Sequence, residues 1–418
     1  MTDIRPPVIT GIGIIAPGGN DRETFWSAMK SGQTATRRPT LCDPAPFRSQ
    51  VAGEVDLPEP ALMDGSLGQT DRAVTLLRAA TSEAINDAGN ALENTAPERI
   101  GVFIGSAVGA TMSMERIYRE TSHDGELYEV DERIEADLYA YFVPSSFISD
   151  VALQYNARGP GELVSNGCTS GIDAIGRAKA AIERGEIDVA IVGATEAPIS
   201  PITFACFDSI MATSPMNDSP ESASRPYDAT RAGFVLAEGA AMLVMESREH
   251  AEARRHASYG QVSGYASFSN AHHMTGLRPE GVELGRAITD ALAEAHLSPD
   301  ELDYVNAHGS GTKQNDLHET AALKLSLGPA AYGVPVSSLK SMTGHSMGSI
   351  GAIEVAACLL AMRDNFVPPT ANLNTPDPDL DLDYVPNVGR EAQVDRVLSI
   401  ASGFGGFQSA IIVERAAS

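Results

Sequence analysis

A single cysteine, Cys168, lies in the small-residue stretch VSNGCTSGIDAIGRAK, residues 164–179, which continues into a helical pattern. A helix start carries roughly half a positive charge and free N–H donors, which favour a thiolate. The pattern therefore predicts that the pKa of the Cys168 thiol is lowered from about 8.5 toward neutrality. The alternative is a buried structural cysteine, but Cys206 and Cys358 fit that role better because their neighbours are apolar. We interpret Cys168 as a nucleophile.

Two of the nine histidines lie where such a nucleophile would need partners. His308 follows a predicted strand at residues 304–307 and begins the loop AHGSGTKQND, and His345 follows a predicted strand at 334–339 in KSMTGHSMG. Side chains at strand ends beside glycine-rich turns commonly form the sites of α/β proteins. Acyl transfer through a thiolate also needs groups for the chemistry that follows the attack. The sequence therefore predicts one site from Cys168, His308 and His345.

Two charged residues accompany His345 in the chain. Lys340 is predicted to end the strand before it, and Glu354 lies in the otherwise apolar helical run SIGAIEVAACLL. Because a buried carboxylate needs a cationic partner, we expect Lys340 and Glu354 to pair. Such a pair could support the histidines or could be purely structural, and the sequence leaves both alternatives open.

The C-terminal stretch SGFGGFQSA, residues 402–410, places three glycines around Phe404. It is either a tight turn before the last strand or a flexible gate whose backbone N–H points at a reacting oxygen. It is not a phosphate loop, because no Lys-Ser or Lys-Thr follows the glycines. Near the N-terminus, Gly11 and Gly13 weakly imitate a dinucleotide fingerprint, but Pro17 interrupts the expected helix start. We therefore predict no nicotinamide cofactor.

Short β-branched runs alternate with helical patterns along the chain, and this alternation predicts an α/β fold with mostly buried sheets. The strand patterns cover residues 8–15, 100–105, 187–193, 239–246, 304–307 and 334–339. The helical patterns cover residues 72–88, 169–184, 281–296, 316–327 and 346–363. Gly167-Cys168 and Gly344-His345 each precede a glycine-containing helix, and this is a weak sequence similarity between two halves. No linker rich in Gly, Ser or Pro divides the chain, so the halves should pack intimately.

The composition restricts the class of protein. A chain of 418 residues is longer than one ordinary core supports, and its net charge of −25 argues against nucleic acid or an anionic membrane surface as the main partner. Four cysteines without CxxC pairing indicate reduced thiols in a cytosolic compartment. We see neither a signal-peptide pattern nor an apolar run of about 20 residues, and we expect a soluble, cytoplasmic protein.

Together, these motifs resemble those of the β-ketoacyl-(acyl carrier protein) synthases, the condensing enzymes of the thiolase fold. The resemblance covers nearly the whole chain, and the segments VITGIGIIAPGG, GCTSG, SRPYDATRAGFVLAEGAA, NAHGSGT, KSMTGHSMG, VPPTANL and GFGG occur in the family's order. Within the family, the chain looks most like the ketosynthase α subunit of type II polyketide synthases. The resemblance implies two similar halves in a layered αβαβα arrangement. We place the half with the cysteine at residues 1–256 and the half with the two histidines at residues 257–418.

The resemblance also implies a mechanism. Cys168 would take the growing acyl chain from the 4'-phosphopantetheine of an acyl carrier protein, and malonyl-carrier protein would then enter. His308 and His345 would assist loss of the carboxylate and stabilise the enolate oxygen, and the new carbanion would attack the Cys168 thioester in a decarboxylative Claisen condensation. The backbone N–H groups of Cys168 and Phe404 would hold the tetrahedral oxyanion.

Further roles follow from the same resemblance. Lys340, Glu354 and Glu319 would support the histidines. No metal and no bound cofactor is implied.

Thr275 and Thr312 match family positions that hydrogen-bond the pantetheine arm. Met112 and Met114 lie in the segment 106–114, which corresponds to the region lining the acyl pocket and the dimer interface, and methionines suit an adaptable apolar tunnel.

The resemblance implies two protein partners, an acyl carrier protein and a chain-length-factor subunit in a heterodimer. The family often has arginine in the segment where this chain has Met211 and Met216, so we hypothesise that much of the charge that docks the carrier protein comes from the partner subunit. The alternatives are a synthase of fatty-acid elongation and a non-condensing scaffold subunit, which would lack the cysteine. A thiolase would need a second cysteine near the C-terminus, and none follows Cys358.

Overall fold

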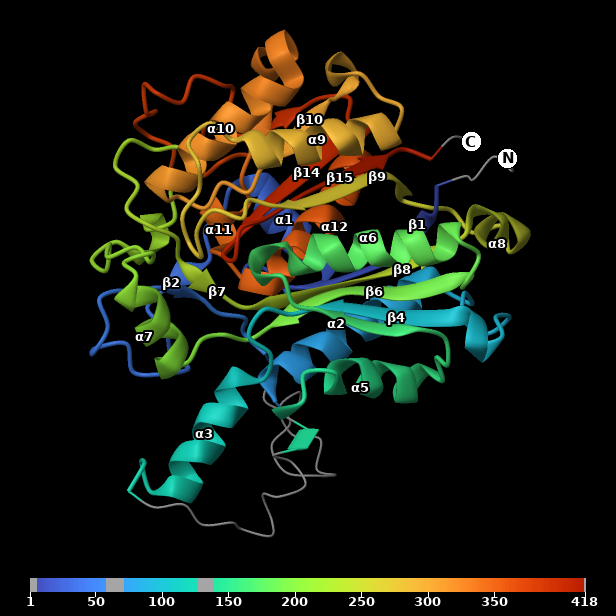
Figure 1. The fold of residues 1–418 in the computed structure, drawn as a ribbon, viewed down its shortest axis with the longest axis horizontal. Coiled ribbons are helices and arrows are strands. Elements are labelled where there is room, and N and C mark those ends of the chain that lie inside the picture. The colour runs from blue at the N-terminus through green and yellow to red at the C-terminus, as the bar shows by residue number, and fades with distance from the viewer. Residues whose placement is uncertain (1–5, 58–70, 127–138, 141, 417–418) are drawn as a thin grey trace.

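The structure is a computed structural model that describes residues 6–57, 71–126, 139–140 and 142–416. Its dominant feature is a ten-stranded sheet in the order β11-β10-β14-β15-β9-β1-β8-β6-β4-β5 (Figure 1). This sheet divides into two sets of five strands at the β9–β1 pairing, which spans two residue pairs. The short boundary lets the two sets form separate layers.

The two sets of strands repeat one topology. The N-terminal set is β1 (Val8–Ile15), β8 (Gly239–Glu246), β6 (Val189–Glu196), β4 (Ile100–Gly105) and β5 (Gly161–Val164). The C-terminal set is β9 (Gly260–Ser269), β15 (Phe407–Glu414), β14 (Arg396–Gly403), β10 (Tyr304–Asn306) and β11 (Val336–Ser337). Counted outward from the boundary, the first two pairings of each set are antiparallel and the last two are parallel. The predicted pair of similar halves is therefore confirmed, while the division at residues 256 and 257 stays a prediction.

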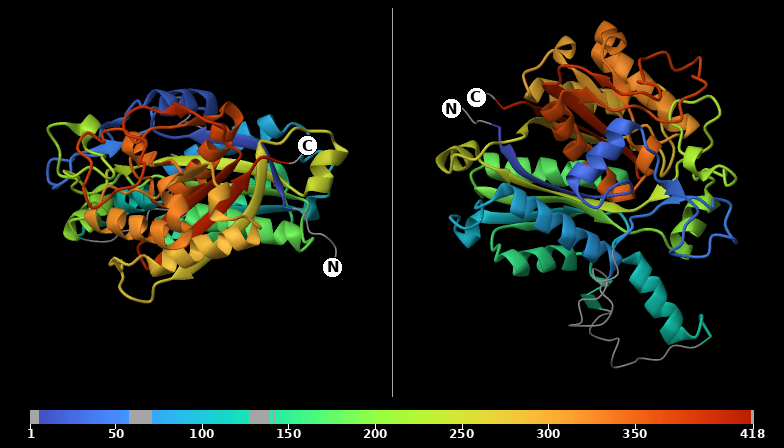
Figure 2. Two further views of the ribbon diagram at one scale, coloured as in Figure 1. Left: turned by 90° about the horizontal axis from the view of Figure 1, so that it is seen from above. Right: turned by 180° about the vertical axis from the view of Figure 1, so that it is seen from behind.

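The helices complete five layers (Figures 1 and 2). Two helices, α6 (Ser170–Glu183) and α12 (Ile350–Asp364), lie between the two sets of strands. The outer face of the N-terminal set is covered by α2 (Arg72–Ala88) and α5 (Ser146–Tyr155), and that of the C-terminal set by α9 (Val282–Glu294) and α10 (Lys313–Leu327). This arrangement confirms the expected αβαβα fold.

The two central helices pack so closely that glycine is required at their contact. A side chain on Gly171 of α6 would lie 2.6 Å from the backbone nitrogen of Ala352, and one on Gly351 of α12 would lie 3.0 Å from that of Ile172. The segments that precede both helices are consequently brought face to face.

The remaining elements are short. The helices are α1 (Arg22–Ser31), α3 (Thr111–Ser122), α7 (Pro201–Ser209), α8 (Arg248–Ala253) and α11 (Lys340–Thr343). The strands are β2 (Thr36–Arg37), β3 (Ala52–Gly53) and β7 (Leu236–Ala237) in one small sheet, and β12 (Phe366–Val367) and β13 (Arg390–Glu391) in another. Helix α3 extends away from the layers (Figure 1). Within the described residues, we find no helix with the length and apolar character to cross a membrane.

One sequence expectation about the elements is wrong. The strand predicted at residues 334–339 is limited to Val336–Ser337, and Lys340 begins the short helix α11 instead of ending a strand. The chain leaves the sheet because the Ser338 N–H donates to the Thr370 hydroxyl (3.1 Å) and the Ser338 hydroxyl donates to the Gly309 carbonyl (2.8 Å). This turn directs Lys340 into the interior, where its side chain is fully buried.

Candidate active site

Cys168 lies in a tight turn, Gly167–Thr169, between β5 and α6. Gly167 has a φ of +59°, and a side chain there would come within 3.0 Å of the Phe404 carbonyl oxygen, so the turn requires glycine. Asp173, one turn into α6, accepts hydrogen bonds from the Asn166 amide and the Thr169 hydroxyl, both at 2.8 Å. The nucleophile is therefore held by its own helix.

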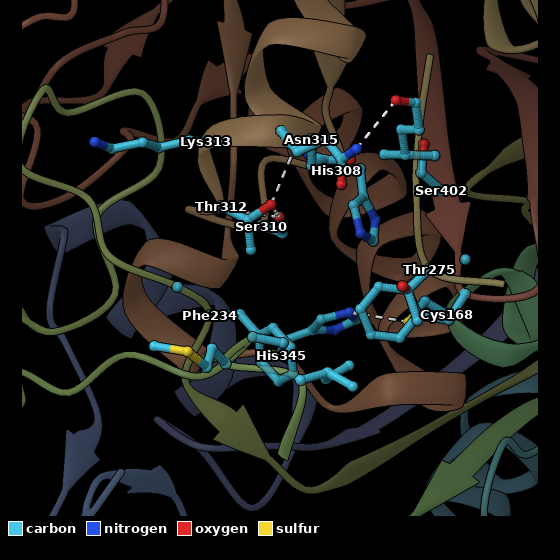
Figure 3. Close-up of a pocket in the computed structure, with 18 of the residues that line it drawn as sticks. Cys168, Phe234, Thr275, His308, Ser310, Thr312, Lys313, Asn315, His345 and Ser402 are labelled. Carbon is cyan, nitrogen blue, oxygen red and sulfur yellow. Dashed lines mark hydrogen bonds between the residues drawn. The ribbon is translucent and has the colours of Figure 1, made fainter. Parts of the chain in front are cut away.

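The structure brings Cys168, His308 and His345 together, as expected (Figure 3). His345 Nε2 is 3.1 Å from Cys168 Sγ. The ring of His308 lies edge-on to that of His345, with 5.2 Å between centroids, and the ring of Phe234 also lies edge-on to His345, with 5.4 Å between centroids. Among the described residues, neither histidine has a hydrogen-bond partner at Nδ1.

The prediction of an acidified thiol is wrong. Burial raises the pKa of the Cys168 thiol to about 12, although the charge of Lys340 and the backbone N–H groups of Phe404 and Cys168 oppose the shift. Burial removes the hydration of the thiolate, and this destabilises the thiolate by more than the positive charge of the helix start stabilises it. Burial, followed by the charge of Lys340, also holds the pKa of His308 and His345 well below 6.5. The resting site therefore contains a neutral thiol and two neutral imidazoles.

Lys340 and Glu354 form the expected ion pair, with 2.6 Å between Lys340 Nζ and Glu354 Oε1. Both side chains are completely buried, at 1% and 0% exposure. Burial raises the pKa of Glu354 to about 7, and Lys340 opposes that rise. The charge of Lys340 adds to burial in holding the pKa of both imidazoles below 6.5.

Glu319 lies under the His308 turn. Its carboxylate accepts hydrogen bonds from the backbone N–H groups of His308 (2.5 Å) and Gly309 (3.0 Å) and from the hydroxyl of Tyr227 (2.6 Å). It therefore contacts the backbone of His308 and not its imidazole.

A cavity of about 500 Å³ leads to the sulfur. Its wall includes Cys168, His308, His345, Phe404, Thr275 and Thr312, so the two threonines lie where a pantetheine arm could contact them (Figure 3). The backbone N–H groups of Phe404 and Cys168 both lie close enough to the sulfur to lower the pKa of the thiol. Their role as an oxyanion site beside Sγ stays a prediction.

Met112 and Met114 are not part of this wall. Both lie on α3, are half-buried and pack against the N-terminal core beneath α2 and α5. Within the described chain they are separate from the Cys168 cavity, so their role in an acyl pocket stays a prediction.

Sequence reasoning missed a buried carboxylate that connects two parts of the site. Glu196, the last residue of β6, accepts hydrogen bonds from the Ser106 hydroxyl and from the N–H groups of Ala107, Val108 and Gly348. Burial raises its pKa to about 7. An acidic residue ending the apolar run VAIVGATE was the available signal.

Comparisons with known proteins agree with this geometry. The family models for the N-terminal and C-terminal domains of β-ketoacyl synthases match residues 5–251 and 259–374. The chain is 54% identical to a putative polyketide β-ketoacyl synthase 1 of Streptomyces halstedii, with 98% of each chain covered. It is 52% identical to the tetracenomycin polyketide synthase ketoacyl synthase alpha subunit of Streptomyces glaucescens, covering 98% of this chain and 96% of that one.

Solved structures give the same result. A type II polyketide ketosynthase in complex with its acyl carrier protein superposes with a TM-score of 0.93 at 35% identity, covering 99% of this chain and all of that chain. The ishigamide ketosynthase/chain length factor superposes with a TM-score of 0.89 at 30% identity, with the same coverage. The chain therefore belongs to the β-ketoacyl synthase family.

Proposed function

We propose that this chain, a ketosynthase, extends a polyketide by condensing malonyl-carrier protein with an acyl chain held as a thioester on Cys168. It acts as the ketosynthase α subunit of a type II polyketide synthase. The observation that carries this proposal is the 3.1 Å contact between Cys168 Sγ and His345 Nε2 on the wall of the cavity, with His308 beside it. A non-condensing scaffold subunit would not need a cysteine beside a histidine on the wall of a cavity.

The first step is acyl transfer. Cys168 Sγ forms a bond to the thioester carbonyl carbon, the bond from that carbon to the pantetheine sulfur breaks, and the thiol proton leaves with the free pantetheine. His345 Nε2 is placed to carry that proton. Because the pKa of the thiol is raised by burial, we propose that the proton is removed as the sulfur attacks, with no resting thiolate.

The second step is decarboxylation and condensation. The bond to the malonyl carboxylate breaks, carbon dioxide leaves, and the electron pair forms an enolate whose oxygen accepts hydrogen bonds from His308 and His345. The carbanion attacks the Cys168 thioester, and the N–H groups of Cys168 and Phe404 hold the oxyanion. One such donor is typically worth about 3 kcal/mol. Collapse of the intermediate breaks the bond to Cys168 Sγ and leaves the extended chain on the carrier protein. The expelled thiolate then takes up one proton from water, which His345 Nε2 is placed to pass on, and the Cys168 thiol returns.

Two partners belong to this proposal. An acyl carrier protein would deliver both substrates on its 4'-phosphopantetheine, and a chain-length-factor subunit would complete a heterodimer. The two solved relatives described above are a ketosynthase with its acyl carrier protein and a ketosynthase with its chain length factor. We place the protein in the cytoplasm, because its nucleophile must remain a reduced thiol, and all four cysteines are free.

The alternative is a homodimeric synthase of fatty-acid elongation. A 3-oxoacyl-[acyl-carrier-protein] synthase 2 of Coxiella burnetii is 37% identical to this chain, compared with 54% for the polyketide relative. This difference favours the polyketide function.

The test is intact-protein mass spectrometry after incubation with an acylated carrier protein, with and without a chain-length-factor subunit. An acyl adduct on Cys168, with malonyl condensation only when the partner is present, is expected. Condensation by this chain alone would indicate the fatty-acid-type enzyme, and no adduct under any condition would leave the scaffold role.

A further inference from the structure

A buried tyrosine outside the reaction cavity has an unusual backbone. Tyr227 is completely buried and has a φ of +64°, a left-handed conformation that bulky residues rarely adopt. Its N–H donates to Asp316 Oδ2 (3.0 Å), and its carbonyl accepts from the Asp377 N–H (3.2 Å). A strained residue persists only where its surroundings hold it, and such residues cluster at functional sites. The position of this side chain therefore needs an explanation.

The Tyr227 hydroxyl points at the support of His308. It donates to Glu319 Oε1 at 2.6 Å, and a side chain on Gly309 would lie 2.8 Å from the hydroxyl oxygen. The same carboxylate accepts the N–H groups of His308 and Gly309. The hydroxyl, the carboxylate and the His308 turn therefore form one continuous set of contacts.

The ionisation of Glu319 decides whether this set is complete. The Glu319 carboxyl group faces four other groups, which are Tyr227, Asp316 on the same helix α10, Lys340 of α11 and neutral His308. Burial, with Asp316, raises the pKa of Glu319 to about 7, while the bond from Tyr227 and the charge of Lys340 oppose the rise. An ionised carboxylate accepts from all three donors, whereas a protonated one presents an O–H toward one of them.

We propose that Tyr227 is a positioning residue whose hydroxyl fixes the Glu319 carboxylate and, through it, the His308 turn for decarboxylation. This inference rests on the proposed function. It assigns Tyr227 no part in acyl transfer to Cys168, because the sulfur contacts His345, which Glu319 does not hold.

The structure supplies a matched control. Tyr384 stacks on Tyr227 with 3.8 Å between ring centroids, and its hydroxyl bonds to the Thr320 hydroxyl at 2.7 Å. Tyr227→Phe and Tyr384→Phe each remove one buried hydroxyl from the same stack, and only the first removes a donor to Glu319. A general effect of a lost buried hydroxyl should appear in both variants.

The experiment measures decarboxylation of malonyl-carrier protein by the assembled synthase between about pH 6 and pH 9, where a group that titrates near 7 is visible. Tyr227→Phe loses a hydrogen bond to the ionised form of Glu319, which raises the pKa of that carboxyl group further. The acid limb of its profile, the pH range in which the decarboxylation rate falls as the pH is lowered, should therefore move to a higher pH by about one unit. Its decarboxylation rate above that limb should fall below that of the wild type, because the carboxylate under the His308 turn loses one of its donors. Its acylation of Cys168 should match the wild type. Tyr384→Phe should keep the wild-type limb.

Three results would overturn the proposal: an unmoved limb in Tyr227→Phe, the same shift in both variants, or slowed acylation of Cys168 in Tyr227→Phe. If Tyr227→Phe does not fold, Glu319→Gln replaces it, since this variant cannot ionise and should lose the acid limb. Retention of the limb in Glu319→Gln would show that Glu319 is not its origin. Wild-type protein that neither decarboxylates nor condenses would instead refute the proposed function.

Discussion

The two halves of the molecule place different chemical groups at equivalent positions. Cys168 lies between the last strand of the N-terminal set and α6, and His345 lies between the last strand of the C-terminal set and α12. Each follows a glycine with positive φ, +59° at Gly167 and +77° at Gly344. One repeated scaffold therefore delivers the nucleophile and its nearest partner to a common point.

The surroundings of the two positions differ in charge. The cysteine turn is tied by Asp173, whose partners Asn166 and Thr169 are uncharged. On the histidine side, the structure buries three ionisable side chains, Lys340, Glu354 and Glu319. The difference teaches that the scaffold sets where the groups lie, while the local charge differs between the two sides. The proposed function uses this difference, with the acyl chain held on one side and the carboxylate released on the other.

Removal of the nucleophile should have the largest effect, because it should abolish condensation and leave decarboxylation in place. In Cys168→Ala, condensation should fall by at least about 10³-fold, because no thioester can form, while decarboxylation of malonyl-carrier protein should persist. Product analysis and measured carbon dioxide release would test this. Cys206→Ala removes an exposed cysteine and is the matched control. Loss of both activities in Cys168→Ala would contradict the division between the sides.

The two histidines should not be equivalent. His308→Ala and His345→Ala should each lower decarboxylation by about 10²- to 10⁴-fold. Only His345→Ala should also slow acylation of Cys168, because His345 alone of the two hydrogen-bonds the sulfur. Rapid-quench mass spectrometry of the acyl adduct would measure this. Equal effects on acylation would remove the distinction.

The buried ion pair can be tested for a role beyond structure. Lys340→Met leaves Glu354 buried without its partner and should destabilise the protein by about 3–5 kcal/mol. Lys340→Met with Glu354→Leu removes both charges and should recover much of that stability without recovering decarboxylation. Chemical denaturation and carbon dioxide release would be compared. Recovery of both properties would make the pair purely structural.

The buried carboxyls should give stability and activity opposite responses to pH. Burial raises the pKa of Glu196, Glu319 and Glu354 from 4.5 to about 7, so near pH 7 the folded chain binds protons that the unfolded chain does not. Lowering the pH from about 8 to about 6.5 should therefore add on the order of 1–2 kcal/mol to the free energy of unfolding. Below about 6.5, protonation of His308 and His345 in the unfolded chain opposes this gain.

Thermal unfolding across this range should therefore show a melting temperature that rises as decarboxylation falls. A melting temperature that falls between pH 8 and pH 6.5 would contradict the assignment of raised carboxyl pKa values.

The smallest expected effect concerns docking. Met211 is 67% exposed and lies on the cavity wall, and Met216, further along the same segment, is half-buried. If the partner subunit supplies the docking charge, this chain alone should bind the carrier protein weakly and with little salt dependence. The heterodimer should bind more tightly and lose affinity as salt is added. Equal affinity and equal salt dependence would refute the hypothesis.

Much of the site could be predicted from the sequence because its motifs are local. A cysteine between small residues at a helix start, and histidines after short strands, are visible without a structure. The Lys340–Glu354 pair was predictable because a carboxylate in an apolar helix requires a cation. Glu196 and Tyr227 were not identified, because their hydrogen-bond partners are distant in the chain. The end of an apolar run indicates that Glu196 is buried, but it does not indicate its partners.

Hydrophobic periodicity in the sequence by itself determined the α/β class. The motifs and their order determined the family and the residues that meet at the site, and the αβαβα arrangement followed from that family resemblance. Only the tertiary structure decided the protonation of those residues. The Cys168 thiol has a raised pKa, not a lowered one, because burial between two layers removes water that no local pattern reveals. Burial is also the main reason that the pKa of both histidines is low, and the charge of Lys340 adds to it. The tertiary structure likewise places the Tyr227 hydroxyl on Glu319, a contact that opposes the rise in the pKa of that carboxyl group.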